Sequence, residues 1–173
     1  MVVFKIKNKY VYFHTVFFTQ YHDFTIIDKL RKEFPDTFIQ ALNFNIIYNY
    51  EHLFEILGIS NLAKTRNIMC SHKIELDFLL RVMGTNQISQ AIKEGGITID
   101  QYITFVVLGK KYRIDKIHQK LEFLFGNSHD EVFTEKSILR KKIEVYKTKY
   151  NNDFFDEENT IKFLTETAVL VMK

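Results

Sequence analysis

Apolar and polar positions alternate along residues 3–7, and residues 10–19 are rich in aromatic and β-branched side chains. Both patterns are typical of β-strands, and Asn8 with Lys9 between them predicts a hairpin turn. Apolar residues then recur with helical spacing behind Asp23, a residue type that caps helices. The N-terminal region therefore predicts a β-hairpin followed by an amphipathic helix.

Glycines and capping residues divide the middle of the chain into short elements. The apolar pattern predicts a strand over residues 38–47 and helices over residues 51–57, 62–67 and 71–83. Gly58 fits the C′ position of the first of these helices, and Gly84 ends the last. Thr85 or Asn86 then caps a further short helix that ends at Gly95.

The C-terminal part predicts one buried strand and several helices. The strand is almost wholly apolar, and the elements cover residues 98–108, 110–125, 137–150 and 156–172. Ser128 with Glu131 spells a capping box. Because strands and helices interleave, we expect an α+β fold in a single domain over residues 1–173. Its sheet would be mixed and largely antiparallel, covered by helices, and its C-terminus helical.

Composition excludes several classes of protein. The 173 residues are 46% hydrophobic and 26% charged, which is typical of a globular chain rather than a disordered or repetitive one. Cys70 is the single cysteine, so neither an internal disulfide nor an all-cysteine zinc site can form. No apolar run approaches the length of a membrane span. We therefore expect a cytoplasmic protein without membrane contact, present also in the nucleus if it is eukaryotic.

Positive charge concentrates in residues 110–149, which carry eleven Lys or Arg and six Asp or Glu, while the whole chain has a net charge of only +3. The block contains Lys110, Lys111, Arg113, Arg140, Lys141, Lys142, Lys147 and Lys149. It is either the solvated face of two amphipathic helices or a surface that contacts phosphate.

Motifs for catalysis are missing from the sequence. Neither a phosphate-binding glycine loop nor an H-E-x-x-H metal motif occurs, and we expect no metal and no cofactor. Cys70 lies two residues from His72 and could form a nucleophile–base pair, but a lone cysteine before a helix more often packs as a small hydrophobe. Four acidic residues near the last helix, Asp153, Asp156, Glu157 and Glu158, are expected to stabilise its N-terminus.

One segment departs from a generic helical pattern. Two predicted helices meet at Gly84 with almost no loop, and the second begins with Thr85, Asn86 and Gln87. Free backbone N–H groups at a helix N-terminus favour anions, and Arg81 stands one turn earlier. The segment is either an anion-binding corner or an ordinary helical hairpin with capping residues.

The order of residues here resembles the small kinase-binding subunit of the KEOPS complex, the PRPK-binding protein family. The matching positions are Asp77, Leu79-Leu80, Arg81, Met83-Gly84, Thr85-Asn86, Gln87-Ile88, Ala91-Ile92 and Gly96-Ile97, with Asn43 and His52-Leu53 upstream. Two positions depart from the family pattern. Met69-Cys70 stands where members carry Ala-Asn, and Met83 stands where they carry Ser or Ala.

The resemblance implies an accessory, regulatory subunit and not an enzyme. Such a subunit binds the complex's atypical kinase/ATPase and recruits tRNA by its 3′ CCA end for threonylcarbamoyl-adenosine modification. The implied tRNA-binding residues are Arg81, Thr85, Asn86, Gln87, Gln90 and Lys93. The kinase-binding residues would be Phe163, Leu170 and Met172, which lie off the main apolar stripe of the last helix. The alternative is a protein–protein scaffold and kinase activator without RNA contact. A stand-alone enzyme has the least support.

Overall fold

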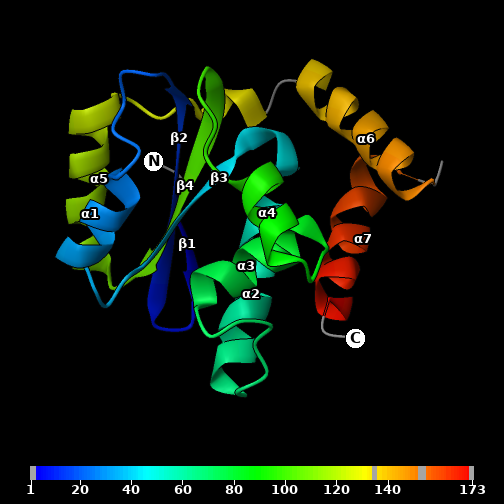
Figure 1. Ribbon diagram of the computed structural model, residues 1–173, viewed down its shortest axis with the longest axis horizontal. Coiled ribbons are helices and arrows are strands. Elements are labelled where there is room, and N and C mark those ends of the chain that lie inside the picture. Colours follow the sequence, from blue (N-terminus) through cyan, green and yellow to red (C-terminus); the bar gives the residue numbers. More distant parts are fainter. Residues whose placement is uncertain (1–2, 134–135, 152–154, 172–173) are drawn as a thin grey trace. The chain divides into compact units, whose positions relative to one another are not determined.

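The computed structural model describes residues 3–133, 136–151 and 155–171 (Figure 1). Its contacts divide the chain into two compact units, each built from two segments. Unit 1 comprises Met1–Phe44 and Ile92–Asp130, and unit 2 comprises Asn45–Ala91 and Glu131–Lys173. The α+β class predicted from the sequence is confirmed, with the sheet in unit 1 and most of the helical structure in unit 2.

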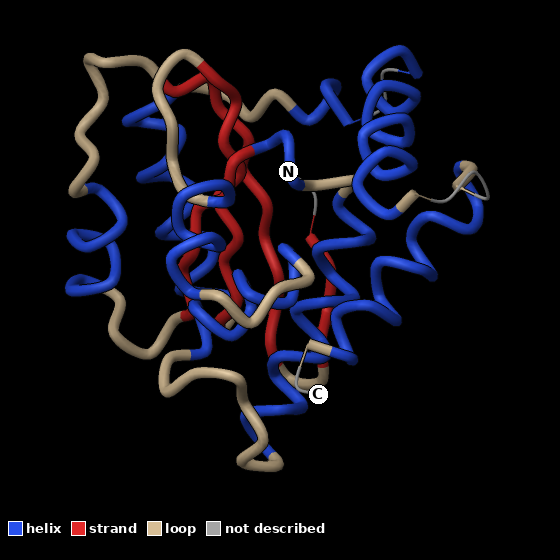
Figure 2. Tube along the Cα trace, turned by 45° about the vertical axis from the view of Figure 1, so that its right-hand side comes forward, coloured by secondary structure: helices blue, strands red, loops and turns tan. Residues whose placement is uncertain are grey.

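Unit 1 is built on a four-stranded sheet, whose strands are red in Figure 2. The strand order is β1-β2-β4-β3, and each neighbouring pair is antiparallel. The strands are β1 (Val3–Ile6), β2 (Lys9–Phe18), β3 (Phe38–Asn43) and β4 (Gln101–Gly109). The predicted hairpin is confirmed, and Lys7 adopts a positive φ of 54° in its turn. Tyr10 lies opposite Lys5 on one side and opposite Gly109 on the other.

Two helices, α1 (Ile26–Glu33) and α5 (Lys111–Phe125), pack on one face of this sheet (Figure 1). They contribute the apolar stripes that the sequence predicted, with Leu30 of α1 and Ile117 of α5 fully buried. The sheet supplies alternate residues of its strands to the same core: Tyr12, Val16, Phe18, Ile39, Ala41, Ile103, Phe105 and Val107. Burial of this apolar face is the main stabilising contribution to unit 1.

The edge strand β3 is partly covered by an arginine. Arg31 of α1 donates from Nε to the carbonyl of Ile39 at 3.0 Å and from Nη2 to Oε1 of Gln40 at 2.6 Å. One carbonyl of this edge strand is therefore already occupied within unit 1.

Unit 2 is helical. Its helices are α2 (Tyr50–Thr65), α3 (Ile74–Met83), α6 (Lys136–Tyr150) and α7 (Glu157–Leu170). The short α4 (Ile88–Gly95) begins in unit 2 and ends in unit 1, and 3-10 turns occupy Phe44–Ile46 and Asp130–Phe133. Helix α7 contacts α2, α3 and α6, so three other helices pack against it. One apolar cluster of this unit contains Tyr48, Ile143, Tyr146, Phe155 and Leu164.

Several local predictions are wrong. The strand predicted over residues 38–47 ends at Asn43, and a 3-10 turn covers Phe44–Ile46. Gly58 does not end a helix, because α2 runs through it without a break. The apolar residues on both sides of Gly58, such as Leu57 and Ala63, are buried along one continuous helix, and this tertiary packing outweighs the glycine. Ser128 does not form a capping box. Its hydroxyl oxygen accepts a hydrogen bond from the Thr15 amide at 2.9 Å, and its hydroxyl contacts Asp130 Oδ1 at 2.6 Å.

Candidate functional site

The sharp turn between α3 and α4 is made by a glycine in the left-handed conformation. Gly84 has φ 61° and ψ 35° and follows the last residue of α3, as the sequence predicted. The amide of Thr85 then donates to the carbonyl of Leu80 at 3.1 Å, which closes the helix end in the manner of a Schellman motif. A residue with a Cβ atom would be strained at this position.

The polar residues after Gly84 form an exposed corner, which we call the α3–α4 corner (Thr85, Asn86, Gln87 and Gln90). The hydroxyl of Thr85 accepts from the amide of Gln87 at 3.1 Å, so it satisfies one of the free N–H groups before α4. Asn86, Gln87 and Gln90 are exposed, and Thr85 is half-buried. Lys93 is exposed on the last turn of α4. The structure thus brings four of the predicted tRNA-binding residues together on the surface.

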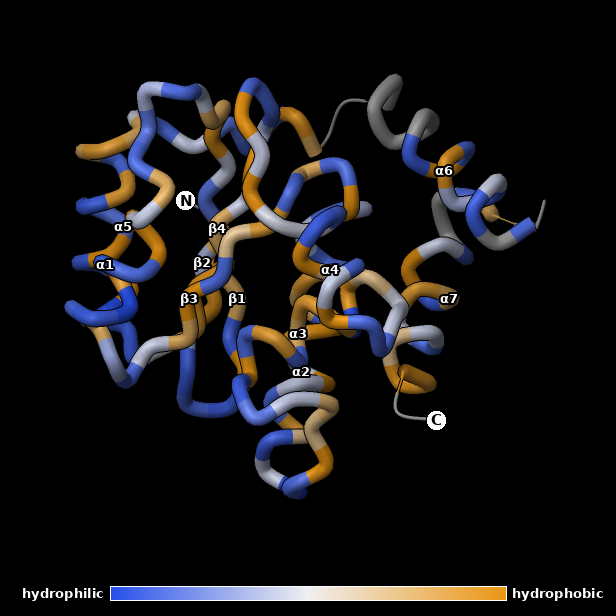
Figure 3. The backbone as a smooth tube through the Cα atoms, in the orientation of Figure 1, coloured by the Kyte–Doolittle hydropathy of each residue, from blue (hydrophilic) through white to orange (hydrophobic). Residues whose placement is uncertain are grey.

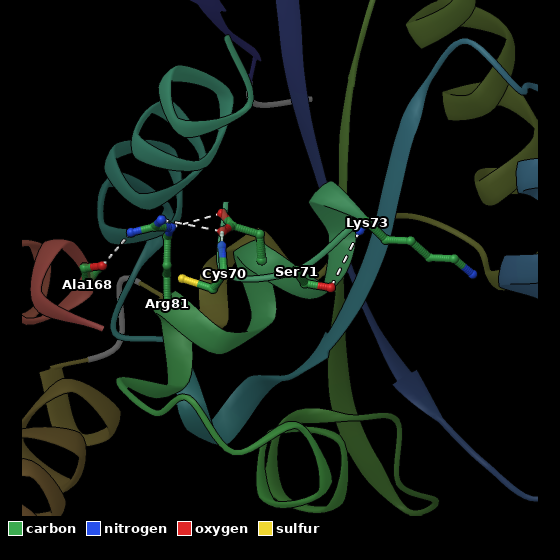
Figure 4. A network of polar contacts seen from close by, with 6 residues as sticks. Cys70, Ser71, Lys73, Arg81 and Ala168 are labelled. Carbon is green, nitrogen blue, oxygen red and sulfur yellow. Dashed lines mark hydrogen bonds and ion pairs between the residues drawn. The ribbon is translucent and has the colours of Figure 1, made fainter. Parts of the chain in front are cut away.

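Arg81 does not belong to this exposed corner. Its side chain is only 2% exposed, and the guanidinium points into unit 2 (Figure 4). Nε donates to Asp77 Oδ2 at 2.8 Å, Nη2 to Asp77 Oδ1 at 3.3 Å, and Nη1 to the carbonyl of Ala168 at 2.8 Å. Because its donors are directed at buried acceptors, Arg81 is not positioned to contact an external phosphate as the sequence predicted.

The Asp77–Arg81 pair instead joins three segments of unit 2. Asp77 is fully buried, and its Oδ1 also accepts from the amide of Cys70 at 2.6 Å. Arg81 caps a carbonyl in the last turn of α7, where a cation is favoured by the helix dipole. The loop before α3, α3 itself and the C-terminal turn of α7 are therefore connected by one charged, hydrogen-bonded group (Figure 4).

Cys70 lies beside this group but is not an activated nucleophile. Its side chain is half-buried, and desolvation raises the pKa of its thiol above the ordinary value. A thiolate is the reactive form of cysteine, so a raised pKa keeps Cys70 neutral at pH 7. His72 is exposed, and no hydrogen bond between it and Cys70 occurs in the part of the chain that the structure describes.

Helix α7 has a buried face and an exposed apolar end. Asp156 caps its N-terminus by accepting from the amide of Asn159 at 2.7 Å, which confirms the stabilising role predicted for that residue. Leu164 and Ala168 are buried, while Val169 and Leu170 are each 54% exposed. Phe163 is half-buried against Phe155, with the ring centroids 4.6 Å apart. Of the predicted kinase-binding residues, Leu170 is thus on the surface, Phe163 is partly internal, and Met172 lies outside the described residues.

Lys142 corrects the prediction made for the basic block. Its side chain is buried, donates from Nζ to the carbonyl of Ile47 and lies 5.0 Å from the centroid of the Phe133 ring. Burial lowers the pKa of Lys142 to about 7, and it lowers the pKa of the fully buried His52 to about 3. Lys142 is therefore neither a solvated residue nor a phosphate contact. The side chains of Arg140 and Lys141 lie outside the described residues.

Unit 1 contains a buried series of hydrogen-bonded side chains that the sequence did not reveal. The hydroxyl of Tyr12 lies 2.6 Å from Nδ1 of His14 and 2.8 Å from Nδ1 of His118. His118 also contacts the carboxylate of Glu122 at 3.4 Å, near the surface. Desolvation and the neighbouring His118 lower the pKa of His14 to about 4, so His14 is neutral at pH 7. Residues two apart on a strand share a face, which places Tyr12 beside His14, but the distant His118 could not be placed there from the sequence.

Within the described residues, no cluster of three His, Cys, Asp or Glu side chains could hold a metal ion. No helix in the described ranges is both long and apolar enough to cross a membrane. No protein-family profile matches the sequence, and no curated protein is detectably similar to it.

Proposed function

We propose that this protein is a non-catalytic subunit of a KEOPS-type complex for threonylcarbamoyl-adenosine modification of tRNA. In this role it binds the atypical kinase/ATPase subunit through the C-terminal end of α7 and recruits tRNA through the 3′ CCA end at the α3–α4 corner. The proposal combines the resemblance of residues 67–97 to the PRPK-binding protein family with the surfaces described above.

The exposed end of α7 is the observation that carries the proposal. Val169 and Leu170 are adjacent, each is 54% exposed, and both follow the fully buried Ala168. Arg81 holds this turn through the Ala168 carbonyl, so the two apolar side chains extend from a fixed backbone. A pre-positioned apolar anchor loses less conformational freedom on binding and suits a protein partner.

The α3–α4 corner supports the contact with tRNA. Unpaired bases at a tRNA end expose hydrogen-bonding edges, and exposed amide side chains can both donate to and accept from such edges. Asn86, Gln87 and Gln90 provide three of them. The side chain of Arg81 takes no part in this contact, and only its backbone carbonyl, which accepts from the Gly84 amide, belongs to the turn that leads to the corner.

A second candidate is a protein–protein scaffold and kinase activator without RNA contact. The burial of Arg81 favours it, since the corner then lacks the cation that was expected to neutralise a phosphate. Lys93 is the nearest exposed cation along the chain after the corner.

Kinase binding is tested with Leu170→Arg in a pull-down with purified kinase subunit. An anchor of this kind typically contributes about 1–3 kcal/mol or more, so we expect binding to fall at least tenfold while the melting temperature stays within a few degrees of wild type. Leu62→Arg is the matched control, because Leu62 is 42% exposed on α2. Full binding by Leu170→Arg, or equal loss in both variants, contradicts the assignment of α7.

The two candidates are separated by filter binding of intact tRNA and of tRNA lacking its CCA end. We expect the trimmed tRNA to bind more weakly, and we expect Asn86→Ala/Gln87→Ala to abolish that difference while Ser89→Ala preserves it. Equal affinity of the wild type for both tRNAs would favour the scaffold.

A further inference from the structure

Two groups of basic residues far apart in the sequence meet at one end of the sheet of unit 1. Tyr10 lies opposite Lys5 and opposite Gly109 in the strand register. The antiparallel strand directions then place Lys9, which precedes Tyr10, at the same end of the sheet as Lys110, which follows Gly109. In Figure 3 the turn of the β1–β2 hairpin is a continuous hydrophilic stretch at this end.

We call the combined surface the hairpin–α5 rim. Its members are Lys5, Lys7, Lys9, Lys110, Lys111 and Arg113. The five lysines are exposed, and Arg113 is half-buried. Two acidic residues lie close by: Asp115 contacts Lys111 at 3.1 Å, and Asp36 precedes Thr37, whose side chain abuts Gly109. Six cations against two carboxylates give the rim a local charge of about +4, more than the +3 of the whole chain.

Aromatic rings lie among these cations. The Nζ atoms of Lys5 and Lys111 are 5.8 Å and 5.9 Å from the centroid of the Tyr10 ring. The guanidinium of Arg113 is 5.1 Å from the centroid of the Tyr112 ring, which is itself 52% exposed. Arg113 also lies 5.8 Å from the Phe34 ring, so the cation that neighbours Tyr112 is held between two aromatic residues.

We propose that the hairpin–α5 rim binds the phosphate backbone of single-stranded RNA, with the exposed ring of Tyr112 as a stacking surface for one unpaired base. Lysines that converge on one edge neutralise successive phosphates, and an aromatic face between them accepts a base without regard to its identity. The lysines and the aromatic ring occur together on this rim, and they come from three different secondary-structure elements of unit 1.

RNA fits this surface better than an anionic membrane. A helix that lies on a lipid surface inserts an apolar face of Trp, Phe or Leu below the headgroups. The exposed aromatic ring of the rim is a tyrosine flanked by a guanidinium, an arrangement that suits a flat, stacked ligand. The rim is distinct from the α3–α4 corner, so this proposal does not depend on recognition of the tRNA 3′ end.

The test is fluorescence anisotropy of a labelled ten-nucleotide oligouridylate with the full chain. We expect the dissociation constant to rise steeply with salt, because each neutralised phosphate releases counterions. Lys9→Glu/Lys110→Glu should weaken binding by about tenfold or more. Tyr112→Ala should weaken binding by about fivefold or more, whereas Tyr112→Phe, which keeps an aromatic ring, should retain most of the wild-type affinity.

Lys64→Glu/Arg66→Glu is the matched control, because it makes the same change in net charge at two exposed residues of unit 2. An equal loss of affinity in this control would show that only net charge matters and would overturn the proposal. Stronger binding to vesicles containing phosphatidylserine than to the oligonucleotide, lost in Lys9→Glu/Lys110→Glu, would assign the rim to a membrane. Asn86→Ala/Gln87→Ala should bind the oligonucleotide as wild type does, so failure of the tRNA-end contact would leave this result unchanged.

Discussion

Each unit buries a pair of polar side chains, and the two pairs differ in charge. Unit 2 encloses a charged pair, Asp77 with Arg81, in which the carboxylate and the guanidinium satisfy each other and two backbone groups. Unit 1 encloses an uncharged pair, Tyr12 with His14, in which the hydroxyl of Tyr12 lies 2.6 Å from Nδ1 of the neutral imidazole. A buried ion pair fails when one partner is removed, whereas a buried neutral imidazole fails when it gains a proton. The Asp77–Arg81 pair is therefore sensitive to mutation, and the Tyr12–His14 pair is sensitive to pH.

The largest expected effect is that of Arg81→Met. It leaves the carboxylate of Asp77 buried without its cation, which typically costs about 3–5 kcal/mol of unfolding free energy. Urea denaturation followed by circular dichroism measures the loss. Asp77→Leu/Arg81→Met, which removes both charges, should recover much of it. If Arg81→Met is as stable as the wild type, the pair does not have the buried environment described here.

A smaller loss of unfolding free energy is expected when the pH is lowered. The pKa of His14 is about 4 in the folded protein and about 6.5 when it is exposed, so the unfolded state binds the extra proton between these values. The contribution of His14 to stability is therefore full above pH 6.5 and is lost as the pH drops to 4, by about 3 kcal/mol. Urea denaturation at pH 7 and pH 4.5 measures the difference.

The contribution of His14 is isolated by His14→Phe, in which the fall in stability between the two pH values should be clearly smaller than in the wild type. The pKa of His52 in unit 2 is also lowered, to about 3, so part of the pH dependence should remain. His72→Phe changes an exposed histidine and should leave the dependence as it is. An unchanged pH dependence in His14→Phe would refute the assignment.

The smallest expected change in unfolding free energy comes from substituting a glycine, and we compare one glycine in each unit. A Cβ atom at Gly58 would meet no atom within 4 Å, and the residue lies inside α2. Gly58→Ala should therefore raise the unfolding free energy by roughly 0.5–1 kcal/mol. A Cβ atom at Gly109 would lie 3.0 Å from Cγ2 of Thr37, so Gly109→Ala should give no such gain. Thermal melting of both variants measures the difference, and equal stabilisation would contradict it.

Regular patterns made most of the fold predictable. The alternation in β1, the aromatic and β-branched run of β2, the apolar run of β4 and the stripe of α5 each report a single element that packs on one core. Gly58 was misread because a glycine has the same local preference whether or not the chain continues beyond it as a packed helix. Whether the helix ends at Gly58 or continues through it depends on its packing against the neighbouring helices.

The candidate site was less predictable, because the sequence does not report the direction of a long side chain. Arg81 stands one turn before an exposed corner, and its spacing permitted contact with that corner. The i, i+4 spacing of Asp77 and Arg81 also indicated an ion pair on a helix. That this pair would be buried depends on Ala168, which arrives from the other end of the chain.

The contact between Arg31 and the Ile39 carbonyl has a consequence for self-association. Exposed strand edges can template the addition of further strands, and a sheet open at both edges can polymerise without limit. In unit 1 the β3 edge already has Arg31 on one of its acceptors, and the β1 edge carries the exposed Lys5. Strand addition would therefore be opposed by an occupied acceptor at one side of the sheet and by like-charge repulsion at the other. Both features act against edge-to-edge pairing of two copies of this sheet.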